Sequence, residues 1–327
     1  MRLLAGFLLA AAAAVSASAQ GSAQGQREQL AQAHAALQAG EADKALGLLN
    51  SLAQPGGGPA EAHNLKCRVL FILEQWDGAA SECEQAVKLD GQNSDYHLWL
   101  GRALGEKADR ASFLSAYSLG KRVRMEFEEA ARLNPRNAEA LADLGEFYYS
   151  APEVVGGGVK KSETVAVQLG QIDSARAHEL RGRIAEERKD YGTAEREYKQ
   201  AIGVGAHPAF QWMTLASFYR RRERWTEMES AVRSGESAAE RDRHAGVALY
   251  NGASVLRATS RDPARAAKML EEYLVGSAKT EEAPAFVAHT WLARLKEQLG
   301  DAAAASRERT AALALAHEYK PAQDLKH

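Results

Sequence analysis

The sequence predicts an all-α chain of helix hairpins stacked one on the next. Helix-forming residues dominate its composition, and no run of alternating β-branched residues indicates a sheet. Helical spacing is clearest in the segment Ala209–Trp225, where Trp212, Leu215, Ala216 and Tyr219 occupy relative positions 0, 3, 4 and 7. These positions lie on one face of an α-helix.

The pattern recurs with a period of about 34 residues. One period earlier, Gly182 stands where Ala216 stands, and Ala194, Tyr198 and Ala201 follow it as the face of a second helix. Copies of one face or the other continue in both directions and weaken toward the ends: Leu141, Leu144, Gly145 and Tyr148; Leu100, Gly101 and Leu104; Phe127 and Ala130; Ala79, Cys83 and Ala86; Ala45 and Leu49; Ala266 and Leu270; Leu292, Ala293 and Ala305.

The two faces read W-x-x-L-small-x-x-Y and A-x-x-x-aromatic-x-x-A, a pattern that resembles the tetratricopeptide repeat. The resemblance implies a right-handed superhelical solenoid of about eight antiparallel helix hairpins, TPR-like throughout. Small residues such as Gly145 and Gly182 would let two helices approach closely, while Tyr198 and Trp212 would fill the gaps between hairpins. A bulky side chain at Gly182 should therefore cost about 1 to 3 kcal/mol, as overpacking typically does.

The N-terminal segment has the pattern of a secretory signal. Arg2 precedes an apolar run from Leu3 to Val15, and Ala17-Ser18-Ala19 forms an A-x-A site. We expect a signal peptide over 1–19, cleaved after Ala19, and an exported, periplasmic protein. An uncleaved membrane anchor is the alternative, but the run is short for a span of about 20 residues. Residues 20–26 would form a flexible lead, 27–320 the solenoid, without an integral membrane span, and 321–327 a tail.

Two cysteines, Cys67 and Cys83, fall on the two helices of one hairpin in the repeat register. A disulfide across the hairpin is one interpretation, and closing a loop of about 15 residues could contribute roughly 3 kcal/mol. Two reduced side chains that fill close-packed positions are the other. The register alone does not give the Cα separation, so the sequence leaves both open.

Two segments depart from the period. Residues 105–122 add a helical insertion to the third hairpin, and Phe113, Leu114, Tyr117 and Leu119 would pack it onto the array. Residues 150–160 form a Gly-rich loop; its sequence GGGVKKS lacks the spacing and the preceding strand of a phosphate-binding loop. We expect a long turn in which the glycines supply positive φ.

No catalytic motif stands out. The sequence lacks H-E-x-x-H, C-x-x-C, G-x-S-x-G and G-x-G-x-x-G. His63, His97, His178 and His289 occupy the position that Trp212 has in its own repeat, which favours packing over metal ligation. We therefore expect no enzyme activity, no metal and no cofactor. A net charge of −2 argues against nucleic acid as the partner.

The resemblance implies that certain positions of each first helix point into a concave groove. In this sequence they form a mixture of Arg, aromatic and amide groups that suits an extended peptide or a partner helix. These residues are Asn64, Arg68, Phe71, Leu98, Arg102, Glu146, Tyr149, Glu179, Arg183, Glu186, Phe210, Met213, Ser217, Arg220, Asn251 and Arg294. We take Phe71, Tyr149 and Phe210 as anchors.

The sequence favours one function, and two others are alternatives. The first is a scaffold or adaptor that binds another protein or a peptide. The second is an accessory protein for envelope polysaccharide binding, export or assembly, with an anionic glycan as partner. The glycan would bind the basic cluster formed by Arg220, Arg221, Arg222 and Arg224. A solvated helix end, whose cations favour the C-terminal dipole, is the simpler explanation of that cluster. The third is an enzyme with an unusual site near residues 150–163. The sequence argues against it, because no set of titratable groups converges there.

Overall fold

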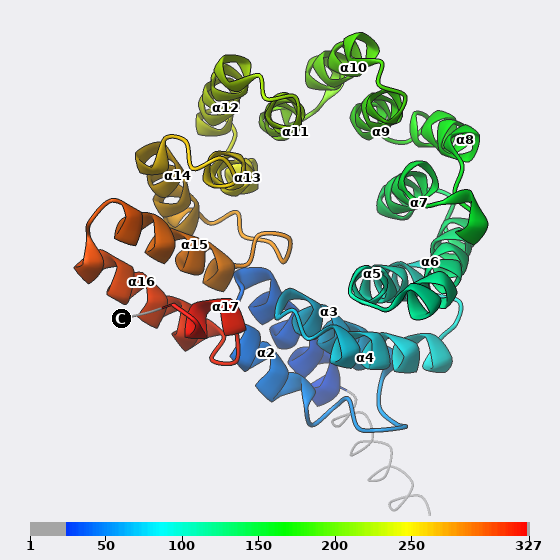
Figure 1. Cartoon of the computed structure of the whole chain (residues 1–327). Helices are drawn as coiled ribbons and strands as arrows, with labels where there is room; N and C mark the ends of the chain where they lie inside the picture. Colours follow the sequence, from blue (N-terminus) through cyan, green and yellow to red (C-terminus); the bar gives the residue numbers. More distant parts are fainter. Residues whose placement is uncertain (1–23, 326–327) are drawn as a thin grey trace, which may run out of the picture.

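The computed structural model describes residues 24–325, and every regular element in this range is a helix. A helix over residues 24–39 pairs with α2, and the following helices pair successively, so that the described residues form eight hairpins as expected (Figure 1). The helices are α2 (Ala42–Leu49), α3 (Ala60–Ile72), α4 (Trp76–Leu89), α5 (Ser94–Asp109), α6 (Phe113–Leu133), α7 (Ala138–Ser150), α8 (Val159–Leu169), α9 (Ser174–Glu187), α10 (Tyr191–Val204), α11 (Pro208–Arg221), α12 (Trp225–Glu240), α13 (Gly246–Arg257), α14 (Pro263–Val275), α15 (Ala285–Gln298), α16 (Ala302–Leu315) and α17 (Lys320–Gln323).

Tight turns within the hairpins share one backbone conformation. A residue one or two positions after the first helix has positive φ, between 56° and 83°, at Gly40, Glu74, Lys189, Glu223 and Gly300. Its backbone N–H bonds back to a carbonyl of the helix end, which satisfies a group that the helix leaves unpaired. Glycine adopts this conformation without cost, whereas the other three residues carry some strain.

Small residues set the helix contacts. A Cβ on Gly182 would lie 2.7 and 2.8 Å from two ring carbons of Tyr198, so the glycine lets the aromatic ring of α10 lie against the backbone of α9. Gly101 stands in the same relation to Phe127 within its hairpin. Gly145 differs, because it faces Leu180 of the next hairpin rather than its own partner helix.

The array curves until its two ends meet, so the chain forms a closed ring (Figure 1). The blue α2 and α3 lie beside the orange and red α15, α16 and α17. One hydrophobic cluster contains buried residues from Leu30 to Leu73 together with residues from Ala185 to Ala322. Gly40 packs directly on Ala285, where any Cβ would collide with the backbone. The first and last hairpins therefore share a core.

The departures from the period take specific forms. The insertion lengthens α6 at its N-terminal end, but Phe113 and Leu114 are 87% and 80% exposed, so they do not pack onto the array as expected. The loop contains a 3-10 turn, Glu153–Val155, and Gly156 and Gly158 have φ of 101° and 151°.

The predicted boundaries also differ at the ends. The signal segment, 1–19, lies outside the described residues, but residues 24–26 of the expected flexible lead are already helical. The expected tail contains α17, where Pro321 occupies a position in the first turn that suits proline. Arg309 donates to the carbonyl of Ala322 over 3.2 Å, which ties α17 to α16.

Candidate functional site

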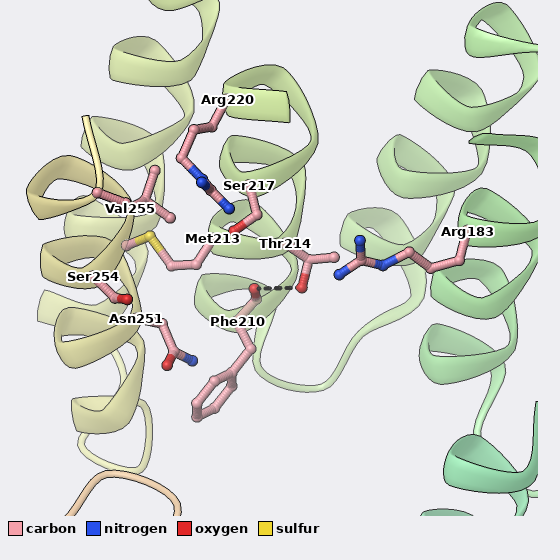
Figure 2. A pocket seen from close by; sticks show the side chains of 10 residues that line it. Arg183, Phe210, Met213, Thr214, Ser217, Arg220, Asn251, Ser254 and Val255 are labelled. Atoms are coloured by element: carbon pink, nitrogen blue, oxygen red, sulfur yellow. Dashed lines mark hydrogen bonds between the residues drawn. The ribbon is translucent and has the colours of Figure 1, made fainter. Parts of the chain in front are cut away.

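A pocket opens between α9, α11 and α13, the first helices of three successive hairpins (Figure 2). Its volume is about 210 Å³. Arg183 comes from α9, whereas Phe210 and Arg220 come from opposite ends of α11. Asn251 extends from α13 on the far side. The residues that line the pocket are Arg183, Phe210, Met213, Thr214, Ser217, Arg220, Asn251, Ser254, Val255 and Ala258.

This pocket gathers many of the residues that the sequence places in the groove: Arg183, Phe210, Met213, Ser217, Arg220 and Asn251. Met213 nevertheless serves mainly as a wall, since it is only 2% exposed and its thioether lies against Gly235 and Gly252. Phe210 and Arg220 are partly exposed in the pocket, as are Arg183 and Asn251.

The pocket is electrostatically positive. Arg220 forms no ion pair with any described residue, and Arg183 reaches Glu186 only at 4.0 Å. Glu186 is instead held by two hydrogen bonds from Arg221, of 2.9 and 2.7 Å. Beside the pocket, burial raises the pKa of Glu179, although Gln211 and Thr214 lie within reach of its carboxyl. Within the described residues, Arg220 therefore has no carboxylate partner, and Arg183 has only a distant one.

Two of the four arginines of the basic cluster are neutralised within the protein. Arg221 pairs with Glu186, and Arg224 pairs with Glu195 over 2.5 Å and with Glu227 over 2.9 Å. Burial opposes ionisation of Glu195, but hydrogen bonds from Lys199, Arg224 and Tyr219 lower its pKa to about 2. Both solvated-end and anion-binding interpretations thus overstate the free charge of this cluster.

The other predicted groove residues lie elsewhere. Asn64 and Leu98 are buried, so they pack rather than face a partner. Arg68 pairs with Glu281 at the joint between the two ends. Burial and the charge of Glu146 raise the pKa of Tyr149, which lies near Arg183 but outside the pocket lining. The sequence pattern identifies the helix face but not the neighbours that cover parts of it.

A second and larger cavity, of about 650 Å³, lies at the joint of the ring. It includes Phe71, Arg102 and Arg294 from the predicted groove. Most of its aromatic lining was not predicted, since it combines helices that are far apart in the sequence: Trp76 and Trp99 from the second and third hairpins, and Tyr250, Trp291 and Tyr319 from the last ones. No repeat pattern could have paired them.

Four histidines of first helices each form a hydrogen bond with a glutamate of the second helix in the same hairpin. Nδ1 contacts a carboxylate oxygen in His63–Glu82, His97–Glu126, His178–Glu197 and His289–Glu308, at 2.6 to 2.7 Å. The geometry agrees with a structural role. Within residues 24–325, His, Cys, Asp and Glu side chains form no group of three that could hold a metal ion.

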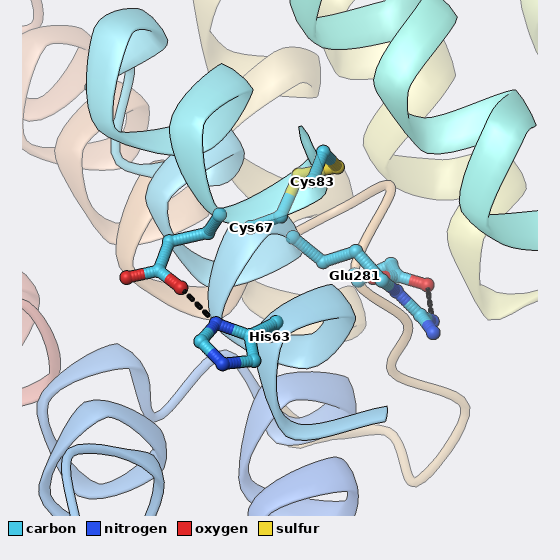
Figure 3. Close-up of a disulfide and its surroundings, with 6 residues drawn as sticks. His63, Cys67, Cys83 and Glu281 are labelled. Atoms are coloured by element: carbon cyan, nitrogen blue, oxygen red, sulfur yellow. Dashed lines mark hydrogen bonds and ion pairs between the residues drawn. A yellow bond between two sulfur atoms is a disulfide. The ribbon is translucent and has the colours of Figure 1, made fainter. Parts of the chain in front are cut away.

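Cys67 of α3 and Cys83 of α4 form a disulfide with a Cα separation of 5.3 Å (Figure 3). Both side chains are fully buried. The bond links the two helices of the hairpin that also carries His63–Glu82 and Arg68. The hairpin at the joint of the ring is thus the one with a covalent link.

The successive helix pairs and the packed small and aromatic residues between them give this chain the tetratricopeptide-repeat fold. Among solved structures, it is similar to the tetratricopeptide-repeat protein TTC0263 of Thermus thermophilus, with 16% identity and a TM-score of 0.50 over 59% of this chain and 98% of that one. Similarity to PilF of Pseudomonas aeruginosa extends over 82% of this chain and 97% of that one, with 13% identity and a TM-score of 0.39.

Another similar structure is YrrB, described as a tetratricopeptide-repeat protein with an unusual peptide-binding site, with 14% identity and a TM-score of 0.36 over 60% of this chain and 95% of that one. No protein-family profile matches the sequence, and no curated protein matches it. Among the described helices, none is both long and apolar enough to cross a bilayer.

Proposed function

We propose that this protein is a non-catalytic scaffold that binds a partner peptide or helix at the pocket between α9, α11 and α13. The single observation that carries the proposal is that Phe210 and Arg220 of α11 and Arg183 of α9 line one pocket, and that both arginines are incompletely neutralised. A flat apolar anchor flanked by cations suits a peptide that has an apolar residue next to an acidic one.

The periplasm is the proposed location. The N-terminal sequence has the basic, apolar and A-x-A parts of a secretory signal. The Cys67–Cys83 disulfide supports export, because such bonds persist mainly in oxidising compartments. Cell fractionation and N-terminal sequencing of the mature protein test this part: recovery in the cytoplasm with Met1 retained would contradict it.

The binding test compares two double variants of the full exported chain. Phe210→Ala with Arg220→Ala removes the anchor and one cation, while Met213 stays because its loss would leave a void beside Gly235 and Gly252. Val275→Ala with Arg233→Ala is the matched control, because both residues are exposed and Arg233 forms no ion pair with a described residue. Affinity capture from envelope extract should recover one protein with the wild type and the control, but not with the pocket variant.

Binding to an anionic envelope glycan is the second candidate function, favoured by the free charge of Arg220. This function predicts capture of acidic polysaccharide rather than protein, and an affinity for the glycan that falls steeply as the salt concentration rises.

In the capture experiment, equal recovery of the same protein by the wild type and by both double variants would contradict the pocket as the binding site.

A further inference from the structure

The cavity at the joint of the ring has walls from both ends of the chain. Phe71 and Ile72 of α3 and Trp76 of α4 line one side. Tyr250 and Arg257 of α13, Trp291 and Arg294 of α15, and Tyr319 line the other. Its volume of about 650 Å³ lies within the range of roughly 300 to 1,000 Å³ that is usual for small-molecule sites.

Arg257 has an unusual environment. Its guanidinium lies 4.3 Å from the ring centroid of Trp291, and that ring stacks on Tyr250 with centroids 4.5 Å apart. The Nε of Arg257 is buried and has no hydrogen-bond partner among the described residues. Burial lowers the pKa of Arg257, and the nearby charge of Arg294 lowers it further. A buried guanidinium N–H without an acceptor costs free energy.

Arg294 supplies the second cation. Its only described hydrogen bond runs to the carbonyl of Pro321, at 3.3 Å, and neither Arg294 nor Arg257 forms an ion pair within residues 24–325. By contrast, Arg102, at the same cavity, is neutralised by Asp143 and Glu139. Two arginines that face one cavity without carboxylate partners are a site for an anionic group.

Two carboxylates limit how much negative charge this cavity accepts. Glu74 accepts a hydrogen bond of 3.3 Å from the hydroxyl of Tyr319, and Glu282 is exposed and forms no ion pair with a described residue. Glu281 is already paired with Arg68. Every anion in this cavity meets two unpaired cations and these two carboxylates, so the lining has little net positive charge and offers little electrostatic gain to a second negative charge on the ligand.

The aromatic and apolar side chains that line the rest of the cavity indicate the chemistry of the uncharged part of the ligand. Aromatic rings from Phe71, Trp76 and Trp291 and the apolar side chains of Ile72 and Val287 surround the space beside the arginines. Flat apolar groups gain most from such walls, because they bury area against ring faces and edges.

We propose that the joint cavity binds a small monocarboxylate with a flat apolar body, with the carboxylate held by Arg257 and Arg294, and that this binding stabilises the closed ring. The site is separate from the pocket between α9, α11 and α13, and goes beyond the proposed scaffold function. Closure and binding are linked because both ends of the chain contribute walls, so a ligand that binds only the closed form shifts the equilibrium toward it.

Isothermal titration calorimetry with three probes tests the chemistry of the ligand. N-acetyl-L-tryptophan carries one carboxylate, its amide carries the same body without charge, and 1-naphthyl phosphate is a flat dianion. We expect the carboxylate to bind at least about tenfold more tightly than the amide, which corresponds to about 1.4 kcal/mol, and more tightly than the phosphate. Equal binding of the acid and the amide, stronger binding of the phosphate, or no binding of any probe would overturn the proposal.

Variants locate the site. Arg294→Gln, on an exposed side chain, and Arg257→Gln should each weaken binding of N-acetyl-L-tryptophan at least about tenfold. Arg220→Gln removes the same charge from the other pocket and should leave the affinity unchanged. Because Arg257→Gln also removes the contact with Trp291, the exposed Arg294→Gln variant decides the matter if Arg257→Gln folds poorly. Unchanged affinity in Arg294→Gln, or an equal loss in Arg220→Gln, would refute the assignment.

The link to ring closure has its own readout. At the same concentration, N-acetyl-L-tryptophan should raise the melting temperature of the wild type more than that of Arg294→Gln. Glu281→Gln, which weakens the joint, should lower the affinity for the probe without touching either arginine. Undiminished affinity in Glu281→Gln, with the ring shown to be open by small-angle X-ray scattering, would contradict the proposed coupling.

Discussion

Arg68 of α3 donates a hydrogen bond of 2.8 Å from Nε to the carboxylate of Glu281, which lies 213 residues later in the chain. A second bond joins its terminal guanidinium nitrogen to the other carboxylate oxygen, so the pair is bidentate. Glu281 is 5% exposed and precedes α15, while Gln38 of the first helix also donates to it over 3.4 Å. This contact fastens the first hairpins to the last ones, at the edge of the joint cavity.

Glu281→Gln should open or loosen the ring. The substitution leaves Arg68 partly buried without its anion, and hydrogen bonds to charged groups typically contribute about 1.5 to 3 kcal/mol. Small-angle X-ray scattering should show a larger radius of gyration, and the melting temperature should fall. Glu282→Gln is the matched control, because Glu282 is exposed and forms no ion pair with a described residue. The same scattering profile for both variants would show that the pair does not hold the joint.

Gly182→Ala should destabilise the fifth hairpin by about 1 to 3 kcal/mol, in the range of overpacking. The new methyl group would lie 2.7 Å from a ring carbon of Tyr198, whose side chain is fully buried and whose hydroxyl donates to Glu186 over 2.5 Å. Chemical denaturation followed by circular dichroism measures the loss.

Gly203→Ala is the control for this substitution. Gly203 lies in α10, and a Cβ there would meet nothing within 4 Å. Alanine favours the helix over glycine by about 1 kcal/mol, so this variant should be at least as stable as the wild type. Equal stability of Gly182→Ala and the wild type would mean that the helices can separate without cost.

Replacing both Cys67 and Cys83 by alanine should lower the free energy of unfolding by about 2 to 4 kcal/mol, the usual contribution of a disulfide. The residues are 16 apart, and both are fully buried, so small voids add to the loss. Alkylation of the denatured wild type without reductant, followed by mass spectrometry, should find no free thiol. Complete alkylation of both cysteines would contradict the bond.

The His97–Glu126 pair should make stability depend on pH. The hydrogen bond to Glu126 raises the pKa of His97 above its ordinary value; burial opposes the shift, and the carbonyl of Gly91 and the charge of Glu129 support it. Both ring nitrogens face acceptors, Glu126 at 2.6 Å and the Gly91 carbonyl at 3.2 Å, so both bonds form together only in the protonated ring.

A raised folded pKa means that the contribution of this pair is fully present below the unfolded pKa of about 6.5. It is lost as pH rises through the folded pKa. Melting temperatures of the wild type and His97→Gln should therefore differ more at low pH than at high pH. His34→Gln is the control, since His34 is exposed and has no ion pair with a described residue. A difference that grows with pH would contradict the assignment.

Local pattern explains why much of the fold could be predicted. The faces of Trp212 to Tyr219 and of Ala194 to Ala201 repeat with the spacing of packed hairpins, and each helix contact depends on residues within about one period of about 34 residues. The residues around Phe210 and Arg220 could be grouped from the sequence for the same reason, because α9, α11 and α13 are the first helices of successive hairpins.

The solvent exposure of individual side chains and the partners of charged ones were harder to predict from the sequence. Phe113 and Leu114 have the composition of buried anchors, yet the lengthened end of α6 leaves them in solvent. Arg68 and Arg221 fall on the predicted groove or basic cluster, but carboxylates from other helices neutralise them. Helical spacing says which side of a helix a residue occupies, not which distant segment lies opposite.

The sequence by itself determined the helix hairpins, their number and their close-packed small residues, because hairpin packing depends on neighbours along the chain. Only the tertiary structure decided that the array closes into a ring, that Arg68 meets Glu281, and that Trp76 and Trp291 line one cavity. The curvature of a solenoid sums small rotations between successive hairpins, and no short-range pattern encodes that sum. The contacts that form where the ends meet therefore belong to the whole chain.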